Sequence, residues 1–304
     1  MNFIHLKYAV EIEKTGSVSK AADNLYMGQP NLSKAIKELE KETGITIFIR
    51  TPKGVTPTEK GREFLKRARE LVNSFDRLCD DYEKEKSGVT EFSIAVPRAE
   101  HMAMAFSNLA ASRQDNSGVR LHYTEADNRS ITEKLLSYDI GIGIITLGRD
   151  KEKKYLKLLD EYGISYRTLQ EYDMKIICGR ESALAGHKGN ITPSDLSELS
   201  ELIYADSEGK ERISGGTGKT ITIGDRGNSY RLLASLPYAY TWSAPLPESI
   251  LSGYGLVQLG ADSFKRKCKD ILIYRRGYEM SVLEEQFLSE LESVREDILL
   301  DKKN

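Results

Sequence analysis

The segment GQPNLSKAIKELEKETG, at residues 28–44, constrains the fold more than any other part of the chain. Proline is favoured at the first position of a helix, where its missing N–H costs no hydrogen bond. Leu32, Ile36 and Leu39 then recur at helical spacing and predict a buried face. Glutamine, asparagine, serine and lysine side chains are left on the other face. The segment therefore predicts a helix whose N-terminal end is polar, cationic and exposed.

The flanking residues predict two more helices and a hairpin. Phe3, Leu6 and Val10 share one helical face, and the run stops at residues 15–16. Ser17 is the expected N-cap of a short second helix, which a tight turn at residues 26–28 follows. After Gly44, the alternating segment ITIFIRTPKGVTPT predicts two strands around residues 52–54. In this arrangement the exposed helix end carries the groups that read base edges and hold phosphates.

These residues resemble the winged helix-turn-helix of LysR-type transcriptional regulators. The matching positions are Gly16-Ser17, Ala21-Ala22, Leu25, Gln29-Pro30, Leu32-Ser33, Ile36, Leu39-Glu40, Gly44, Phe48, Arg50, Thr58-Glu59 and Gly61. Two positions depart from the family pattern: Gly28 replaces a serine, and Ile49 replaces an acidic residue. The resemblance and the exposed face together give these expected DNA-binding residues: Ser17, Gln29, Pro30, Asn31, Ser33, Lys34, Lys37, Arg50 and Lys53.

Charge is distributed unevenly along the chain. The whole chain has a net charge of −2, which argues against indiscriminate binding of nucleic acid. Residues 1–69 contain 13 Lys and Arg against 8 Asp and Glu, whereas the remainder contains 31 against 38. A basic head on an acidic body favours a polyanionic partner for the head, although solvated faces alone also give modest asymmetry.

The three cysteines are far apart and form no CxxC pair, which is typical of free thiols in a reducing compartment. The N-terminal residues do not resemble a signal peptide, and no apolar run is long enough to span a membrane. The sequence therefore predicts a cytoplasmic location and no membrane partner.

Residues 58–86 read as one long helix. A heptad seam runs along it, formed by Phe64, Ala68, Leu71, Phe75, Leu78 and Tyr82. A single amphipathic helix lying on its own domain would show a similar pattern. The strict spacing favours pairing with a second copy, and the family resemblance implies the same dimerising linker.

Strand and helix signals alternate through residues 89–304 and predict α/β sheets with parallel strands, with one of the helices near 194–200. The order resembles the regulatory domain of the same family, which has two lobes like those of periplasmic binding proteins. The expected domains are a winged helix-turn-helix at 1–58, a linker helix at 59–88 and a regulatory domain at 89–304. Lobe one would comprise 89–168 and 270–304, and lobe two 169–269.

Ligands of such two-lobed domains meet the carboxyl ends of strands and the N-termini of helices. The expected effector-binding residues are Arg98, Glu100, His101, Asn128, Arg129, Asp206 and Trp242. Arg98 suits an anionic effector and equally a surface salt bridge. Tyr238, Tyr240 and Trp242 alternate in a strand that either lines an aromatic pocket or, as the sequence favours, buries these rings in the core.

The segment ISGGTGKT, at residues 213–220, suggests a phosphate-binding loop, but Ile213 stands where that loop needs glycine and a β-branched run follows. The four histidines have no metal-binding spacing, and no nucleophile motif is present, so neither an enzyme, a cofactor nor a metal is predicted. A small-molecule binding protein without a transcriptional role is the alternative, which the basic winged head disfavours. The sequence thus predicts a dimeric or tetrameric regulator of double-stranded DNA that responds to a small molecule of unknown identity.

Overall fold

The computed structural model describes residues 1–51, 54–87, 89–114, 118–205, 219–224 and 226–300. Two compact units divide the chain: Met1–Gly88 with Leu136–Tyr138, and Val89–Leu135 with Asp139–Asn304. Each is described by itself below.

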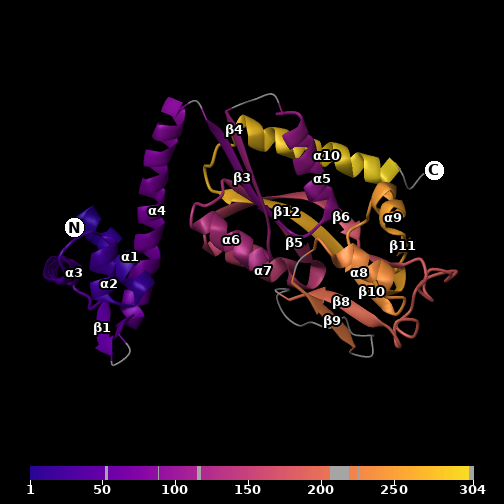
Figure 1. Ribbon diagram of the computed structural model, residues 1–304, viewed down its shortest axis with the longest axis horizontal. Helices are drawn as coiled ribbons and strands as arrows, with labels where there is room; N and C mark the ends of the chain where they lie inside the picture. The colour runs from indigo at the N-terminus through magenta and orange to yellow at the C-terminus, as the bar shows by residue number, and fades with distance from the viewer. Residues whose placement is uncertain (52–53, 88, 115–117, 206–218, 225, 301–304) are drawn as a thin grey trace. The chain divides into compact units, whose positions relative to one another are not determined.

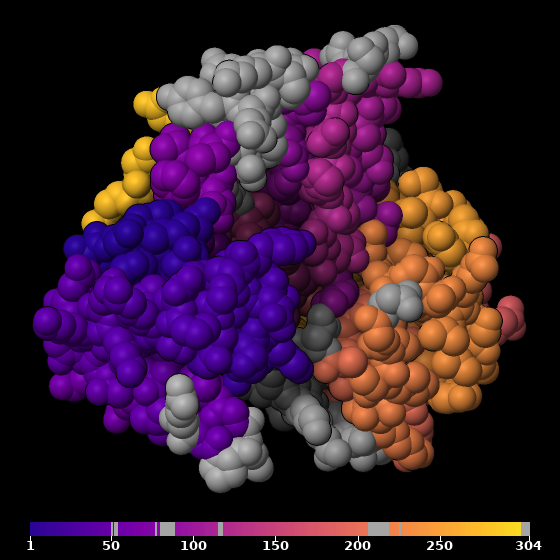
Figure 2. Space-filling model, turned by 60° about the vertical axis from the view of Figure 1, so that its left-hand side comes forward, coloured from indigo at the N-terminus to yellow at the C-terminus, as the bar shows by residue number. Residues whose placement is uncertain are grey.

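The first unit contains the head and one long helix (Figure 1). Its elements are α1 (Phe3–Thr15), α2 (Val18–Asn24), α3 (Gln29–Thr43), β1 (Phe48–Thr51), β2 (Gly54–Pro57) and α4 (Glu59–Ser87). Strands β1 and β2 pair antiparallel, as the hairpin pattern predicted. Leu6, Ile12, Leu32, Leu39 and Leu65 are fully or almost fully buried in one core that joins the helices. In Figure 2 the indigo and violet atoms of the head form a continuous surface of their own.

The second unit contains two five-stranded sheets. In chain order its elements are β3 (Thr90–Val96), α5 (Glu100–Ala111), β4 (Val119–Glu125), α6 (Asn128–Leu136), β5 (Ile142–Gly148), α7 (Arg149–Glu161), β6 (Ile164–Asp173), β7 (Lys175–Gly179), β8 (Ser200–Tyr204), β9 (Thr220–Ile223), α8 (Ser229–Ser235), β10 (Ala239–Ser243), α9 (Glu248–Tyr254), β11 (Leu256–Leu259), a 3₁₀ turn (Asp262–Phe264), β12 (Lys267–Arg275) and α10 (Val282–Leu300).

The first sheet, of order β4-β3-β5-β12-β6, is the base of lobe one. Figure 1 shows α5 and α10 on one face of this sheet and α6 and α7 on the other. Phe92, Met102 and Phe287 are buried between the sheet, α5 and α10. The second sheet, of order β11-β7-β10-β8-β9, is the base of lobe two, against which α8 and α9 pack.

The sheets are mixed and not simply parallel. Strand β3 pairs parallel with β4 and β5, but β12 runs antiparallel to both β5 and β6. The reason is that the chain crosses between lobes twice, so β12 returns to the first sheet from its far side. The crossings lie between Asp173 and Lys175 and just before Lys267, whereas the expected boundaries near residues 169 and 270 fall inside β6 and β12.

The helix expected near residues 194–200 is absent, because residues 193–198 form turns and Ser200 already belongs to β8. The strand expected at YAYTW is β10, and Tyr240 is buried in it, as predicted. Tyr238 lies before that strand and is 51% exposed, so it does not join the core.

Candidate DNA-binding surface and inter-lobe sites

Helix α3 presents its polar N-terminal end to solvent. Gly28 is the N-cap, and no described side chain caps the helix there. Because the first N–H groups of a helix have no partner within it, this end can accept an anion such as a phosphate. Most of the expected contact residues are exposed here: Gln29, Pro30, Asn31, Lys34 and Lys37.

Ser33 differs from the expectation that it faces outward. Its hydroxyl oxygen is buried and has no hydrogen-bond partner among the described residues. Ser33 lies three positions before the buried Ile36, so the two side chains share one side of α3. Ser17, in contrast, acts locally as the N-cap of α2, where its Oγ accepts a bond from the Lys20 N–H at 3.4 Å.

Several family-like residues of the head have structural roles. Glu40 Oε1 accepts bonds from the Ile47 and Phe48 N–H groups, at 2.6 and 3.1 Å, and so ties α3 to the wing. Thr58 accepts a bond from the Gly61 N–H at 2.8 Å at the start of α4. A Cβ atom on Gly61 would lie 2.1 Å from the Ile47 carbonyl oxygen, so only glycine allows this approach.

The expected DNA contacts of the wing are only partly within the described structure. Backbone pairing places Arg50 opposite Val55, but its side chain is not described, and Lys53 lies outside the described residues. Ile49, at the position where the family has an acidic residue, is 48% exposed.

The expected heptad seam of α4 divides into two parts. Ala68 is buried in the head's own core and Phe64 packs against that core, so these two residues do not form a free seam. The correction has a simple cause, since the first turns of α4 cover α1. Leu71 and Leu78 are each 54% exposed, and Phe75 is 45% exposed while its ring lies 4.7 Å from that of Phe3. The side chain of Tyr82 is outside the description.

Arg226 of lobe two joins two carboxylates of lobe one. Its guanidinium lies 3.3 Å from Glu100 Oε2 and 3.1 Å from Glu125 Oε1. Burial alone would lower the pKa of Arg226, but the two carboxylates outweigh burial and raise it. Tyr230 and Tyr123 donate to the same carboxylates, each at 3.1 Å. We call Glu100, Tyr123, Glu125, Arg226 and Tyr230 the inter-lobe cluster.

Arg98 lies at the edge of this cluster. Its guanidinium stacks over the ring of Tyr204 on β8, 5.0 Å from the ring centroid, which is another contact between the lobes. Two of the expected effector-binding residues, Arg98 and Glu100, therefore meet residues of lobe two.

His101 belongs to a different group, a buried polar network around Asp270 of β12. His101 Nε2 lies 2.9 Å from Asp270 Oδ2, and Gln170 donates to the same oxygen. Asp270 Oδ1 accepts from Thr146 at 2.5 Å and from Tyr172 at 3.1 Å. Burial raises the pKa of the Asp270 carboxyl, but the bonds from His101, Thr146 and Gln170 outweigh burial and hold it below its ordinary value.

The remaining expected effector residues serve other purposes. Asn128 uses its amide to hold the backbone of Thr146, with bonds of 2.8 and 3.0 Å. Arg129 is on the solvent side of α6, paired with Glu133 at 2.8 Å. Trp242 packs edge-on against Phe264, with Arg266 over its ring. Asp206 lies outside the described residues.

The sequence reasoning missed several residues that complete these sites, namely Glu125, Gln170, Tyr172, Arg226, Asp270 and Arg295. One signal was available for Asp270, since this carboxylate stands directly before the apolar strand run ILIY. Arg226 follows residues outside the description and had no local pattern to mark it.

In the part of the chain that the structure describes, no cluster of three or more histidine, cysteine, aspartate or glutamate side chains could hold a metal ion. Among the described helices none has the length and apolar character needed to cross a membrane.

The head matches a known family. The family model described as "Bacterial regulatory helix-turn-helix protein, lysR family" matches residues 3–62. The HTH-type transcriptional regulator YcgK of Bacillus subtilis (strain 168), itself described as uncharacterized, is 29% identical over 149 residues, which cover 49% of this chain and 46% of that protein. The alignment thus spans about half the length of this relative.

The whole chain also shares its fold with solved full-length proteins. A full-length OxyR variant from Pseudomonas aeruginosa superposes with a TM-score of 0.60 at 15% identity, over 97% of this chain and 96% of that one. Full-length CbnR complexed with its target DNA gives 0.58 at 16% identity, over 97% and 100%. At such identities the likeness concerns the fold alone. Residues 3–62 thus match the lysR family of bacterial regulatory helix-turn-helix proteins, and the chain as a whole shares the fold of these full-length proteins.

Proposed function

We propose that the chain is a sequence-specific DNA-binding transcriptional regulator, modulated by a small molecule bound between the two lobes of its regulatory domain. The observation that carries the DNA-binding part is the exposed, uncapped N-terminal end of α3, which presents Gln29, Asn31 and Lys34. Glutamine and asparagine pair with adenine edges in the major groove, and lysine neutralises phosphate. CbnR, which has the same fold, has been solved complexed with its target DNA.

Two substitutions separate base reading from phosphate binding. Gln29→Ala is expected to remove roughly 1–3 kcal/mol of discrimination between the preferred site and random DNA. Lys34→Ala is expected to weaken binding to the preferred site and to random DNA alike. It should also reduce the slope of the logarithm of affinity against the logarithm of salt concentration by about one. Fluorescence anisotropy with a DNA site selected from a random library, at several salt concentrations, measures both effects.

Lys41→Ala is the matched control, because Lys41 is exposed in the last turn of α3, far along the helix from Gln29. Its DNA affinity should stay close to that of the unsubstituted protein. If Gln29→Ala binds the selected site and random DNA in the original ratio, the base-reading role is wrong. If the protein shows no preference for any sequence, sequence-specific regulation itself is wrong.

The inter-lobe cluster supports the effector part of the proposal. Arg226 is held by carboxylates of the opposite lobe, and Arg98 stacks on Tyr204 across the same boundary. A ligand that inserts here exchanges these contacts for its own, so its affinity differs between two arrangements of the lobes. The difference in the ligand's binding free energy between the two arrangements is the free energy by which it shifts the equilibrium between them.

A thermal-shift screen of the full chain against anionic, cationic and aromatic metabolites tests this part. A ligand at 100 times its dissociation constant stabilises a fold by about 2.7 kcal/mol. Loss of the stabilisation in Arg98→Ala or Arg226→Gln would place the ligand in the cluster. A ligand that binds the body but leaves DNA affinity unchanged would contradict the regulatory link while leaving DNA binding intact.

The remaining parts of the proposal follow from DNA binding. A two-fold DNA site is best matched by a homodimer or by a tetramer made of two dimers, joined through α4. A cytoplasmic location is part of the proposal, because the protein needs access to DNA. The proposed action is binding without catalysis. Nucleotide binding through residues 213–220 is not proposed, because strand β9 begins at Thr220, where a phosphate-binding loop needs a helix.

A further inference from the structure

A cavity of about 230 Å³ lies beside the crossings between the two sheets. Both lobes line it: α5, β6 and α10 contribute from lobe one, and β7 with residues 244–245 from lobe two. It includes no member of the inter-lobe cluster. Ligand pockets in proteins usually have volumes of about 300–1,000 Å³. This cavity is slightly smaller, so it suits a small organic molecule.

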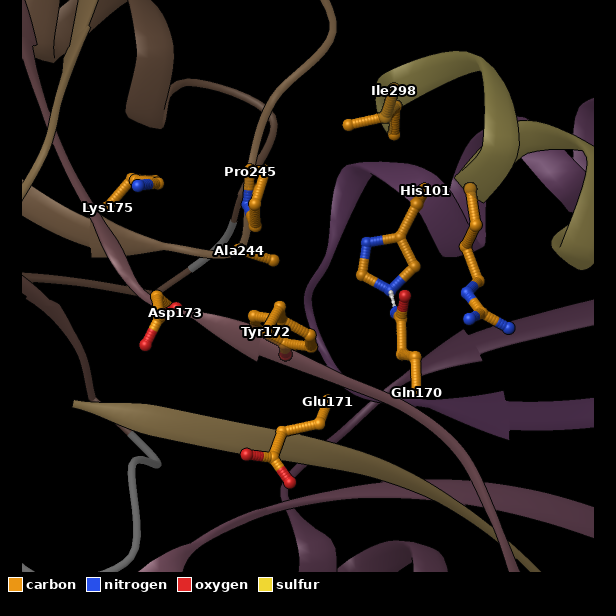
Figure 3. Close-up of a pocket in the computed structure, with 10 residues that line it drawn as sticks. His101, Gln170, Glu171, Tyr172, Asp173, Lys175, Ala244, Pro245 and Ile298 are labelled. Carbon is orange, nitrogen blue, oxygen red and sulfur yellow. Dashed lines mark hydrogen bonds between the residues drawn. The ribbon is translucent and has the colours of Figure 1, made fainter. Parts of the chain in front are cut away.

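His101 directs one free polar atom into this cavity. Its Nε2 lies 2.9 Å from Asp270 Oδ2 and 2.9 Å from the side-chain nitrogen of Gln170. Of these two neighbours only the ionised carboxylate accepts a proton, so Nε2 carries the proton and donates to Asp270. Figure 3 shows that the other ring nitrogen, Nδ1, points away from Gln170 toward Pro245 and Ala244. A ligand carboxyl group can share one proton with Nδ1, either as an acid that donates to the neutral ring or as a carboxylate that accepts from the charged ring.

Arg295 supplies a positive charge at the same end. It lies one helical turn before Ile298 on α10, so both side chains are on one face of the helix, and Figure 3 shows Ile298 beside His101. The Arg295 Nε is buried and has no hydrogen-bond partner among the described residues. A buried guanidinium nitrogen without an acceptor is costly, and a carboxylate is its best-matched partner.

The other charges that line the cavity do not oppose a carboxylate at this end. Glu171 points down and away from His101 in Figure 3, and it pairs with Arg149 at 3.3 Å and with Lys267 at 3.7 Å. Asp173 and Lys175 both lie on the left of Figure 3, away from His101, and their formal charges are opposite. The wall between the two ends is apolar and consists of Ala244, Pro245 and Ile298, all buried.

We propose that this hinge cavity binds a small organic acid, whose carboxylate contacts Arg295 and His101 and whose apolar body packs on Ala244, Pro245 and Ile298. Because the lining comes from both lobes, the bound acid fixes their arrangement at the crossings. The site is separate from the inter-lobe cluster, and the proposal does not depend on DNA binding.

Isothermal titration of the full chain with benzoate and isovalerate tests the proposal, with benzamide and isovaleramide as uncharged molecules of matching shape. At least one acid is expected to bind with a dissociation constant of about 1 mM or lower, at least tenfold more tightly than its amide. Arg295→Gln should abolish this preference, because the amide side chain keeps hydrogen bonding but loses the charge. Ala244→Leu should block both acid and amide by filling the cavity.

A control variant makes the result specific. Arg129→Gln removes one positive charge from the exposed face of α6. This variant should bind the acid within about twofold of the original affinity, whereas 1.4 kcal/mol corresponds to a tenfold change. The proposal is overturned if neither acid binds, if acid and amide bind equally, or if Arg295→Gln and Ala244→Leu both keep the original affinity for the acid.

Discussion

At the scale of single residues, Arg226 is the side chain on which the contact between lobes depends most. Its replacement by glutamine leaves Glu100 and Glu125 facing each other in a half-buried site without a cation. Breaking such a partly buried pair by removing one partner is expected to cost roughly 2–4 kcal/mol. Urea unfolding, followed by the fluorescence of the single tryptophan, Trp242, measures this loss.

Arg129→Gln is the matched control for that loss. Arg129 also pairs with a glutamate, but both partners are exposed, and exposed pairs contribute about 0–1 kcal/mol. Equal destabilisation by the two substitutions would mean that the Arg226 contacts add nothing beyond an ordinary surface pair.

Asp270 should make the unfolding free energy of the protein depend on pH. Its pKa in the folded protein lies below the ordinary value, so the ionised carboxylate contributes stability that is fully present above the unfolded pKa of about 3.9. That contribution is lost as the pH falls through the folded pKa. The difference in unfolding free energy between the original protein and Asp270→Asn should therefore shrink as the pH is lowered from about 5 to about 3. Urea titrations at each pH check it, and a constant difference would show that the network does not favour the ionised form.

At the scale of elements, the junction of the wing with α4 depends on one glycine. A methyl group at Gly61 would lie 2.1 Å from the Ile47 carbonyl oxygen, and a backbone atom cannot move aside cheaply. Gly61→Ala is expected to destabilise the head by roughly 2–4 kcal/mol, in the range of overpacked or strained sites. Hydrogen exchange of the α1 and α3 amides measures the effect.

Gly253→Ala is the control for this substitution, because Gly253 lies in α9 with no atom within 4 Å of an added Cβ. There, alanine should stabilise the helix by about 0.5–1 kcal/mol. If Gly61→Ala were as harmless as Gly253→Ala, the close approach of α4 to the wing would be wrong.

The sequence predicted elements well where the apolar period was clear. Leu32, Ile36 and Leu39 specified α3, and the alternation around residues 45–58 specified the β1–β2 hairpin. It failed where local pattern and tertiary role differ. Ser33 has the side chain of a solvent-facing residue, yet its hydroxyl is buried, and Ala68 fits a dimer seam as well as it fits the head's own core. Periodicity shows that a face is apolar, but not which partner covers it.

At the scale of the whole molecule, the two-lobed plan could be predicted from the strand–helix alternation and the family resemblance, but the partners within the inter-lobe cluster and the Asp270 network could not. His101 and Glu100 are neighbours in sequence, yet one enters the Asp270 network and the other reaches Arg226. Side chains of adjacent helical residues point in directions about 100° apart, and only the folded sheets determine what each meets. Arg226 and Asp270 became visible only when distant strands and loops were brought together.

The oligomeric state is the property of the whole molecule that α4 should decide. Leu71 and Leu78 are seven residues apart, each 54% exposed, which suits one apolar stripe against a second copy of the helix. The double substitution Leu71→Glu with Leu78→Glu is expected to convert the proposed dimer to a monomer. It should also weaken binding to a DNA site with two half-sites by at least about a hundredfold, because the second head is no longer tethered. Light scattering gives the mass, and anisotropy gives the affinity. Leu232→Glu, at a leucine of α8 that is 38% exposed, should change neither. An unchanged mass in the double variant would show that α4 does not hold the copies together.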